Sequence, residues 1–272
     1  MVGQQPPIVE VGRRSNWRQL PGRVWRFFGT GFSFVVFGFG GLLIGLFVFP
    51  LIALFARNTE TRLVMARRLV GWDFTVFIRL MNGLGVMAYQ IDGAEYVGKA
   101  HNQLIIANHP TLIDVIFLVS IFPGADCVVK EAVSKNPFMR GVVSMARYIP
   151  SDDPVNLLDT CVKRLKSGAS LVLFPEGTRT VPGQPLKFKL GAASIAVRSG
   201  ADILPVTIQC SHPRLLAKHE PWYMVPEEKP LFSIKIHPPM SVESLIPGDL
   251  QLRQATHTLN LKLSEFFTKE LS

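Results

Sequence analysis

The feature that most constrains this chain is a run of 30 residues without a charged side chain, from Phe27 to Ala56. As one α-helix, such a run is about 45 Å long, whereas the hydrocarbon core of a bilayer is about 30 Å thick. It lies too deep in the chain, and is too long, for the apolar part of a secretory signal peptide. The run therefore predicts a membrane-associated helical segment, either a tilted single span or a shallow hairpin.

Glycines and a proline inside the run slightly favour the hairpin. Gly38, Gly40 and Gly41 fall in its middle, where they weaken a helix, and Pro50 falls in its second half. Arginines flank the run on both sides, and a hairpin places both flanks on the cytoplasmic face of the membrane. The spacing Gly41-x-x-x-Gly45 occurs in helix dimers, but loose packing is the favoured interpretation here.

The positive charge of the chain is concentrated around the same run. The net charge is +9, and residues 1–79 contain ten arginines, no lysine and only three acidic residues. Nucleic-acid binding requires basic residues on the folded domain, so this distribution argues against it. Arginines beside an apolar run suit an anionic lipid surface, where each contributes about 1 kcal/mol. We expect the chain at the inner (cytoplasmic) membrane, with its folded part facing the cytosol. The ten arginines are Arg13, Arg14, Arg18, Arg23, Arg26, Arg57, Arg62, Arg67, Arg68 and Arg79.

A second predicted helix covers residues 58–84. Its apolar residues fall on one side, and Arg62, Arg67 and Arg68 fall elsewhere. Such a helix either lies at the bilayer interface or packs on the folded domain, and the pattern leaves both open. We place an N-terminal membrane anchor and interfacial helix at residues 1–85 and a second domain at residues 86–272. The apolar residues are Leu63, Leu69, Val70, Phe74, Phe77, Ile78 and Met81.

From Val86 onward, short apolar runs alternate with helical patterns, which predicts an α/β sandwich with a largely parallel sheet. The expected strands are Val86–Ile91, Leu104–Ala107, Asp126–Val129, Leu171–Phe174, Ile203–Ile208 and Phe232–Ile236. The expected helices are Thr111–Phe122, Glu131–Ala146, Val155–Ser167, Leu190–Ser199 and Leu250–Glu270. Leu252, Leu259, Leu263 and Phe266 of the last helix are expected to pack on the sheet. The three cysteines lack the spacing of a disulfide framework or a zinc site.

The first candidate site follows the second expected strand, in the sequence Asn-His-Pro-Thr-Leu-Ile-Asp over residues 108–114. His109 lies on the loop at the carboxyl end of that strand, where open α/β sheets place their sites. Asp114 falls in the first turn of the next helix, within reach of the imidazole. A carboxylate there fixes one tautomer, so that the other ring nitrogen can take a proton. The alternatives are a first-turn carboxylate that favours the helix dipole and an ordinary loop histidine.

The second candidate site, Phe-Pro-Glu-Gly-Thr-Arg at residues 174–179, also follows an apolar strand. Gly177 permits a tight turn that exposes backbone N–H groups, and Arg179 supplies a planar, permanently charged fork for phosphate. Lys187 and Lys189 add cations before the next helix. By itself, this motif is also compatible with an ordinary turn and a surface salt bridge.

The two motifs, in this order and about 65 residues apart, resemble those of the lysophospholipid (1-acylglycerol-3-phosphate) acyltransferase family. The resemblance covers about residues 86–210. Residues 129–141 are similar to the family's intermediate block, and Ile203-Leu204-Pro205-Val206 is similar to its late block. The resemblance implies a glycerolphosphate-acyltransferase-like α/β sandwich and an enzyme of phospholipid biosynthesis.

The resemblance also implies a mechanism. His109, oriented by Asp114, is the general base that activates an acceptor hydroxyl, which attacks the thioester of acyl-CoA or acyl-acyl carrier protein. Glu176, Gly177, Thr178 and Arg179 hold the phosphate or equivalent head group of a lysophospholipid-type acceptor, and Lys130 adds charge nearby. No metal or other cofactor is expected, since positioning and base catalysis suffice.

The chain departs from the family pattern at one position. The intermediate block commonly ends in an apolar strand followed by an arginine, whereas Ser151 follows Tyr148-Ile149-Pro150 here and Arg147 precedes it. An acceptor other than lysophosphatidate, including an amino-acid-based lyso-lipid, is therefore an alternative. A phospholipid transacylase and an inactive, membrane-anchored lipid-binding or scaffold protein are two further alternatives.

Overall fold

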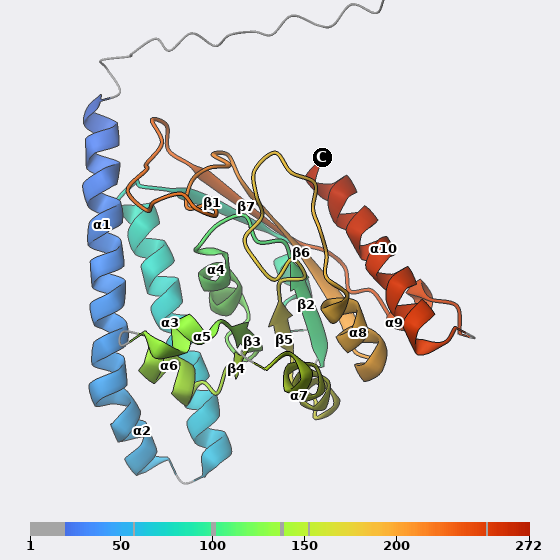
Figure 1. Ribbon diagram of the computed structural model, residues 1–272. Helices are drawn as coiled ribbons and strands as arrows, with labels where there is room; N and C mark the ends of the chain where they lie inside the picture. Colours follow the sequence, from blue (N-terminus) through green and yellow to red (C-terminus); the bar gives the residue numbers. More distant parts are fainter. Residues whose placement is uncertain (1–19, 57, 99–101, 137–138, 152, 249) are drawn as a thin grey trace, which may run out of the picture.

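The apolar run forms one continuous helix in the structure, a computed structural model that describes residues 20–272 except 57, 99–101, 137–138, 152 and 249 (Figure 1). α1 (Leu20–Leu43) passes into a π-helical turn, η2 (Ile44–Val48), and then into α2 (Phe49–Phe55). The expected break at the glycines is therefore wrong. A glycine costs a helix only about 1 kcal/mol, which packing against a neighbouring helix outweighs. Arg13, Arg14, Arg18 and Arg57 lie outside the described residues.

This helix is long and apolar enough to cross a membrane. The stretch Gly22–Phe55 has 34 residues and a mean hydropathy of 2.5, and it is the only such helix in the part of the chain that the structure describes. Pro50 lies in the first turn of α2, directly after the π-helical turn, in which the N–H of Phe49 donates to the carbonyl of Ile44 five residues earlier. The Cβ position of Gly141 in α6 (Arg140–Met145) lies 3.1 Å from Cα of Gly45, so the two backbones touch at η2.

The second helix, α3 (Thr59–Gly83), packs between α1 and α4 (Asp114–Ile121). Asn58 caps it by accepting the N–H of Thr61 at 2.7 Å. Phe37 of α1 contacts the rings of Phe74 and Phe77 of α3, with centroids 5.3 and 4.7 Å apart. One side of α3 is therefore covered, which agrees with the alternative of a helix packed on the domain.

Arg67 corrects the expectation that the arginines of α3 lie away from its packed side. Its side chain is buried, and its guanidinium forms an ion pair with the buried carboxylate of Asp126. Arg67 Nε and Nη1 also donate to the carbonyls of Ala146 and Gly124, at 3.0 Å each. A buried arginine is stable only when its donors are satisfied in this way, and here it ties α3 to the sheet.

Seven strands form one sheet, in the order β1-β7-β6-β2-β5-β3-β4. All neighbouring pairs are parallel except β6 and β7, so the expectation of a largely parallel sheet is confirmed. The strands are β1 (Ala88–Asp92), β2 (Gln103–Ala107), β3 (Asp126–Val129), β4 (Ile149–Pro150), β5 (Leu171–Leu173), β6 (Asp202–Cys210) and β7 (Leu231–Ile236). β4 was not among the expected strands, because two residues are too short to show a pattern.

Helices cover both faces of the sheet, which gives three layers, and the long N-terminal helix lies outside them (Figure 1). α3 and α4 cover one face, and behind them lies the long helix α1–η2–α2. The other face is covered by α7 (Pro154–Lys166), α8 (Leu190–Ser199) and α10 (Leu252–Leu271). Short elements η3 (Ala94–Tyr96) and α9 (Val242–Leu245) complete the chain.

Two expected helices differ from the structure for local reasons. The expected helix over residues 131–146 is divided into α5 (Glu131–Lys135) and α6, because Asn136 precedes a proline and has an extended ψ of 123°. In α10, Leu259 and Leu263 are buried as expected, but Leu252 is 48% exposed and Phe267 is the fully buried aromatic residue. Leu252 begins the helix, beyond the edge of the surface that α10 covers.

Candidate active site

Both sequence motifs follow strands in the middle of the sheet. Residues 108–114 follow β2 and residues 174–179 follow β5, and these two strands are parallel neighbours. Their carboxyl ends therefore meet at one edge of the sheet, which brings the two loops together. This is the edge at which parallel α/β sheets commonly bind ligands.

The imidazole of His109 is held by the carboxylate of Asp114. The distance from Nδ1 to Asp114 Oδ2 is 2.8 Å. A carboxylate only accepts hydrogen bonds, so Nδ1 donates and Nε2 is left as the proton acceptor. Asp114 is completely buried at the start of α4, whereas the His109 side chain is 19% exposed. This geometry gives a base that reaches solvent and an orienting carboxylate that does not.

Thr111 holds the same carboxylate from its other side. Its N–H donates to Asp114 Oδ2 at 2.6 Å, and its hydroxyl donates to Oδ1 at 2.5 Å. Burial raises the pKa of Asp114, and the hydrogen bonds from His109 and Thr111 oppose that rise. α4 begins at Asp114, three residues later than expected, because residues 111–113 form the turn that makes these contacts.

Glu176 joins the two loops. Its Oε1 accepts the backbone N–H of His109 at 3.0 Å and the hydroxyl of Thr180 at 2.8 Å, while the N–H of Thr180 donates to the His109 carbonyl at 2.7 Å. The side chain is only 7% exposed, and burial raises the pKa of its carboxyl. The structure thus places Glu176 behind the loop that carries His109, against the backbone of that loop.

Phe174 and Asn108 also position the loop, and neither was expected to have a role. The Phe174 ring stacks on the His109 ring, with centroids 4.1 Å apart and planes 20° apart. Asn108 binds the backbone of Ile208 in β6 twice, through its amide nitrogen and its oxygen, at 2.8 Å each. Their signal in the sequence was their place as the first residues of the two motifs, at strand ends, where backbone groups are left to be satisfied.

Arg179 lies on the rim of the site and is fixed by a distant loop. Its Nη1 donates to the carbonyls of Leu216 and Ala217, at 2.9 Å each. The carbonyl of Leu216 also accepts the N–H of Leu112, at 3.0 Å. Leu216 has a φ of 53°, a left-handed conformation that leucine rarely adopts and that functional sites often retain. Nη2 and Nε of Arg179 have no partner among the described residues, which leaves them for an anion.

Lys189 adds a second cation beside the turn of the second motif. Gly177 has a φ of 64°, a conformation that favours glycine, and its Cβ position lies 2.8 Å from the ammonium nitrogen of Lys189. The N–H of Lys189 donates to the Pro175 carbonyl at 2.8 Å, which fixes the start of α8 over the turn. The exposed ammonium lies directly over the turn that was expected to bind an anion.

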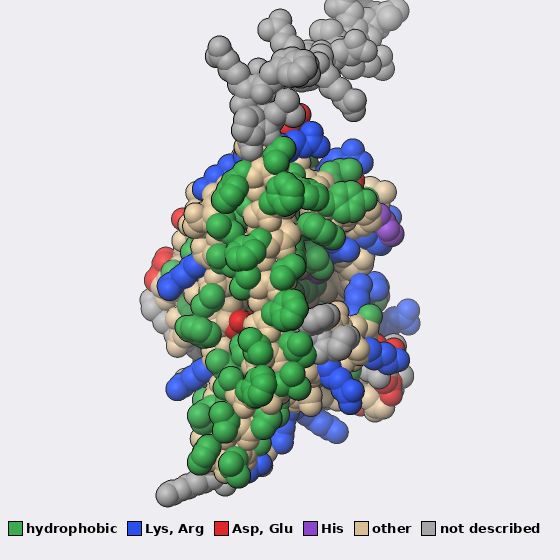
Figure 2. Space-filling model, turned by 90° about the vertical axis from the view of Figure 1, so that its left-hand side faces the viewer, with side chains coloured by type: hydrophobic (Ala, Val, Ile, Leu, Met, Phe, Trp, Pro, Cys, Tyr) green, Lys and Arg blue, Asp and Glu red, His purple; other side chains and the backbone are tan. Residues whose placement is uncertain are grey.

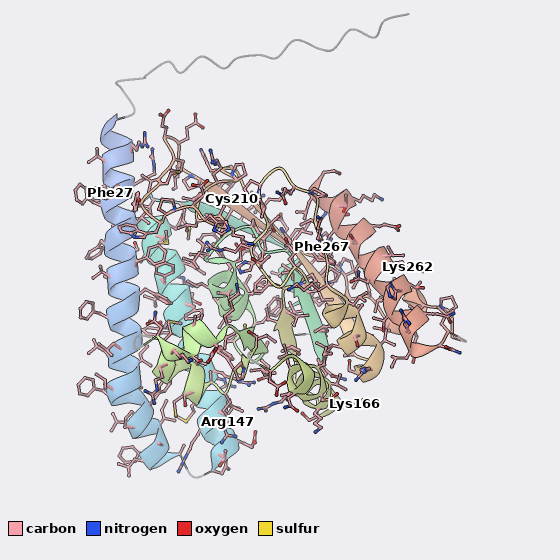
Figure 3. The ribbon with its side chains drawn as sticks, in the orientation of Figure 1. Phe27, Arg147, Lys166, Cys210, Lys262 and Phe267 are labelled. Atoms are coloured by element: carbon pink, nitrogen blue, oxygen red, sulfur yellow. The ribbon has the colours of Figure 1, made fainter. Side chains whose placement is uncertain are left out.

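Two basic residues singled out from the sequence lie apart from this group. Lys130 follows β3, at the same edge of the sheet, and its side chain is exposed. Arg147 lies just before the amino end of β4. Cys210 ends β6 at the other end of the strands, where their carboxyl ends lie (Figure 3). Ser151 follows β4 and donates its N–H to the Val129 carbonyl at 2.9 Å. Arg147 therefore lies at the other end of the strands from the two motifs.

The described residues contain no group of three His, Cys, Asp or Glu side chains that could hold a metal ion. What the site does contain is a base with an open nitrogen, an orienting carboxylate and two cations on the rim. Such a set can deprotonate a hydroxyl that belongs to an anionic molecule.

Comparison with known proteins concerns the same part of the chain. The family model described as Acyltransferase matches residues 88–209, which contain both motifs. We name residues 88–209 the acyltransferase domain, after the model that they match. The match begins at the first residue of β1 and ends one residue before the end of β6. The acyltransferase domain therefore includes six of the seven strands of the sheet, all except β7.

The relatives of this acyltransferase domain share one name. The chain is 31% identical, over 125 residues, to the chloroplastic 1-acyl-sn-glycerol-3-phosphate acyltransferase LPAT1 of Arabidopsis thaliana, which covers 43% of this chain and 35% of that protein. It is 22% identical to the human alpha form over 216 residues, or 77% and 71% of the two chains. The chain thus spans about a third of the length of the chloroplastic relatives that it matches.

A solved structure shares the fold of nearly the whole chain. The 1-acyl-sn-glycerophosphate (LPA) acyltransferase PlsC from Thermotoga maritima superposes with a TM-score of 0.64 over 92% of this chain and 98% of that one, at 22% identity. The likeness extends beyond the acyltransferase domain, so the fold resemblance includes the N-terminal helices.

Proposed function

We propose that this chain is a membrane-associated 1-acylglycerol-3-phosphate acyltransferase. It transfers a fatty acyl chain from a thioester, acyl-CoA or acyl-acyl carrier protein, to the free hydroxyl of a lysophospholipid-type acceptor. The observation that carries the proposal is the contact of 2.8 Å between His109 Nδ1 and Asp114, next to the Arg179 loop. The acyltransferase domain match and the names of the relatives support it.

The proposed reaction needs one base and no covalent enzyme intermediate. His109 Nε2 takes the proton of the acceptor hydroxyl as its oxygen attacks the thioester carbonyl carbon. The tetrahedral intermediate then collapses, the carbon–sulfur bond breaks, and the imidazolium returns its proton to the departing thiolate. The products are an ester and a free thiol. Asp114 stabilises the imidazolium during this sequence because its carboxylate faces Nδ1.

The acceptor head group is proposed to bind at Arg179 and Lys189. Nη2 and Nε of Arg179 have no partner among the described residues, and Lys189 lies over Gly177. A planar guanidinium and an ammonium together suit a phosphate monoester, which presents several oxygens. Glu176 serves this site through the loop backbone, since its carboxylate is already bound to His109 and Thr180.

Membrane attachment is proposed to occur through one side of the N-terminal helix. Figure 2 shows hydrophobic side chains along the length of this face, with Lys and Arg side chains on both flanks. Its other side packs on α3, so α1 cannot be surrounded by lipid as a spanning helix is. Insertion of one face into one leaflet fits this geometry. The exposed side chains of α1, η2 and α2 include Phe28, Phe32, Phe39, Leu43, Leu46, Phe47, Leu51, Leu54 and Phe55.

The test is an acyl-transfer assay with the purified full chain. Radiolabelled acyl-CoA and acyl-acyl carrier protein are offered with a panel of lyso-lipids that includes lysophosphatidate and an amino-acid-based lyso-lipid, and products are separated by thin-layer chromatography. We expect ester formation on lysophosphatidate that is lost in His109→Ala. His257→Ala is the matched control, because His257 is exposed on α10.

Each alternative gives a different result in this assay. Transfer at the wild-type rate by His109→Ala would disprove the base mechanism. Acylation of the amino-acid-based lyso-lipid alone would move the acceptor away from lysophosphatidate. Transfer from a diacyl phospholipid without any thioester would indicate a transacylase, and absence of transfer with every donor would leave a lipid-binding protein.

A further inference from the structure

The segment between β6 and β7 carries a cluster of exposed apolar side chains that the acyl-transfer chemistry does not use. Trp222, Tyr223 and Met224 are 45%, 55% and 45% exposed, and they follow one another directly. The Trp222 and Tyr223 rings contact each other, with centroids 5.9 Å apart. A soluble surface rarely exposes three such side chains in a row, so they mark a contact surface.

This cluster is attached to the N-terminal helix. Trp222 stacks on Phe27 of α1, with centroids 5.9 Å apart and planes 21° apart, and it lies over Gly31, where a Cβ would come within 3.4 Å of the ring. Figure 3 shows Phe27 near the amino-terminal end of α1. Phe27 itself is 37% exposed and is followed by the exposed Phe28. The cluster and the apolar face of α1 therefore form one continuous surface.

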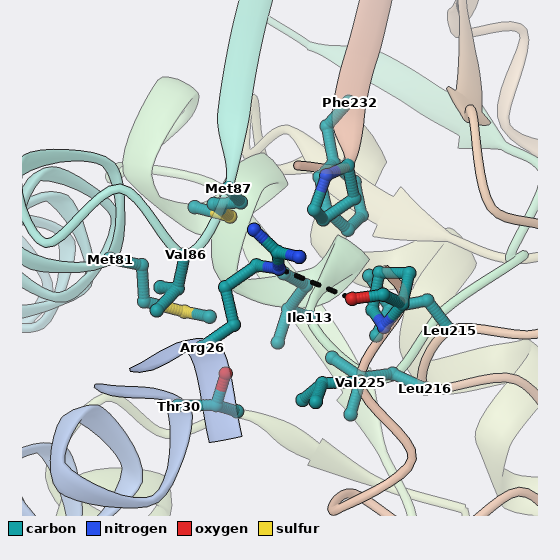
Figure 4. Close-up of a pocket in the computed structure, with 12 residues that line it drawn as sticks. Arg26, Thr30, Met81, Val86, Met87, Ile113, Leu215, Leu216, Val225 and Phe232 are labelled. Atoms are coloured by element: carbon teal, nitrogen blue, oxygen red, sulfur yellow. Dashed lines mark hydrogen bonds between the residues drawn. The ribbon is translucent and has the colours of Figure 1, made fainter. Parts of the chain in front are cut away.

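Hydrogen bonds hold the segment in this place. Arg26 Nε donates to the Pro226 carbonyl at 3.2 Å, drawn as the dashed line in Figure 4, and its Nη2 donates to the carbonyl of Glu227. Leu215, Leu216 and Val225 of the same segment line a pocket with Ile113 of the catalytic loop (Figure 4). The segment thus touches α1 on one side and the active site on the other.

We propose that Trp222, Tyr223 and Met224 insert into the interfacial region of a phospholipid bilayer as a second contact beside α1. This inference rests on the proposed membrane attachment of the chain. Tryptophan and tyrosine favour the level of the lipid head groups, because their rings are apolar and their N–H and O–H groups are polar. The same segment holds Arg179 through the Leu216 and Ala217 carbonyls. Docking of the cluster therefore sets Arg179 at the height of the lipid phosphates.

The chemistry of the cluster selects lipid over other occupants. Some of the neighbouring charges are offset, since Arg23 faces Glu227 at 3.9 Å, Lys229 follows Glu228, and the guanidinium of Arg26 is bound to backbone carbonyls. The contact is therefore apolar, and its strength should change little with salt. Its continuity with the far longer apolar face of α1 favours a planar bilayer, which is the one surface that covers both at once.

The experiment measures binding of the full chain to phosphatidylcholine vesicles by co-sedimentation, without any assay of activity. We expect the triple variant Trp222→Ser, Tyr223→Ser, Met224→Ser to bind at least about tenfold more weakly, because three half-exposed side chains no longer bury apolar surface in the bilayer. Leu261→Ser is the control, since Leu261 is 62% exposed on α10. The loss should persist at high salt.

A second measurement locates the tryptophan directly. In a variant whose only tryptophan is Trp222, we expect brominated lipids to quench its fluorescence. With vesicle-embedded acceptor, the triple variant should raise the acceptor KM and keep kcat, whereas with detergent-dispersed acceptor the KM should not change.

The outcomes separate this inference from the attachment on which it rests. If the wild-type chain fails to bind vesicles, the attachment itself is wrong. If the wild type binds and the triple variant binds equally well, without quenching of Trp222, the second contact is wrong. A dimer in solution that the triple variant abolishes would instead assign the cluster to contact between two copies of the chain.

Discussion

The His109 ring is restrained on two sides, by a carboxylate at Nδ1 and by the Phe174 ring against one face. Asp114 is fully buried and already accepts two hydrogen bonds from Thr111, so its orientation is fixed before substrate binds. This preorganisation is what a single-base mechanism requires, because the base has to present one particular nitrogen.

We expect Asp114→Asn to lower kcat by about 10²–10⁴-fold, the range over which a positioned acid or base contributes. The neutral amide still fits but no longer stabilises the imidazolium, and the acceptor KM should change little. Steady-state kinetics on purified protein measure both constants. Thr111→Val is the matched variant, with a smaller loss of kcat, because its hydroxyl binds only Oδ1. Wild-type kcat in Asp114→Asn would show that Asp114 does not orient the base.

Glu176 gives a second prediction at this scale. Glu176→Ala should lower kcat about tenfold or more, because two hydrogen bonds to a buried carboxylate are lost and the catalytic loop is released. Glu176→Gln keeps an accepting oxygen and should restore most of the activity, and neither variant should raise the acceptor KM. Arg179→Ala, by contrast, should raise that KM. A rise in KM without loss of kcat in Glu176→Ala would assign this carboxylate to the head group.

At the scale of elements, the sheet was predictable because its strands are short apolar runs that end in polar motifs. β3 and α8 have the expected bounds, and the other central strands differ by one or two residues. The proximity of His109 and residues 174–179 followed from two neighbouring carboxyl ends. What a single sequence could not show was the contact that crosses layers, such as the Phe174 ring on His109 or the Leu216 carbonyl on Arg179, because no local pattern encodes it.

Arg67 is a second case of a contact that the sequence could not predict. The sequence places it among arginines suited to a lipid surface, yet the fold buries it against Asp126 of β3, 59 residues away. Tertiary packing decides such a residue, since the helix pattern alone is compatible with either environment. The glycines of α1 are a further case, because contact with α3 maintains a helix that their intrinsic preferences weaken.

We expect Arg67→Met to lower the free energy of unfolding by about 3 kcal/mol or more, because it leaves the Asp126 carboxylate buried without a counter-charge. Thermal unfolding in detergent compares it with Arg68→Met, whose exposed arginine should tolerate the change. The double variant Arg67→Met, Asp126→Asn should recover part of the loss. Equal stability of the Arg67 and Arg68 variants would mean that the ion pair does not tie α3 to the sheet.

For the whole molecule, the N-terminal helices and the acyltransferase domain form one packed unit. α3 lies between α1 and α4, and one hydrophobic core includes residues of all three together with the sheet. Deletion of α1 would therefore expose the aromatic side chains of α3 as well as remove the membrane face. Substitutions confined to the exposed side of this unit test membrane attachment without that damage.

Asp73 is the acidic group that makes such a test sensitive to pH. Its Oδ1 lies 3.3 Å from the Cβ position of Gly40 on α1, and the exposed Trp72 precedes it. Figure 2 shows acidic atoms within the hydrophobic face. Burial raises the pKa of Asp73 to about 6, so the carboxyl is charged at pH 7.5 and mostly neutral at pH 5. A neutral carboxyl enters an apolar environment at lower free energy than a carboxylate does.

Binding of the full chain to phosphatidylcholine vesicles should therefore strengthen as the pH falls through about 6. The gain between about pH 7.5 and 5 should be roughly tenfold if lipid contact raises the pKa of Asp73 by about one further unit. Asp73→Asn should bind tightly at both pH values and show a flat profile. Glu60→Gln is the control, because Glu60 is exposed at the start of α3 and should leave the pH dependence intact. If Asp73→Asn keeps the full pH dependence, another group titrates and Asp73 does not face the lipid.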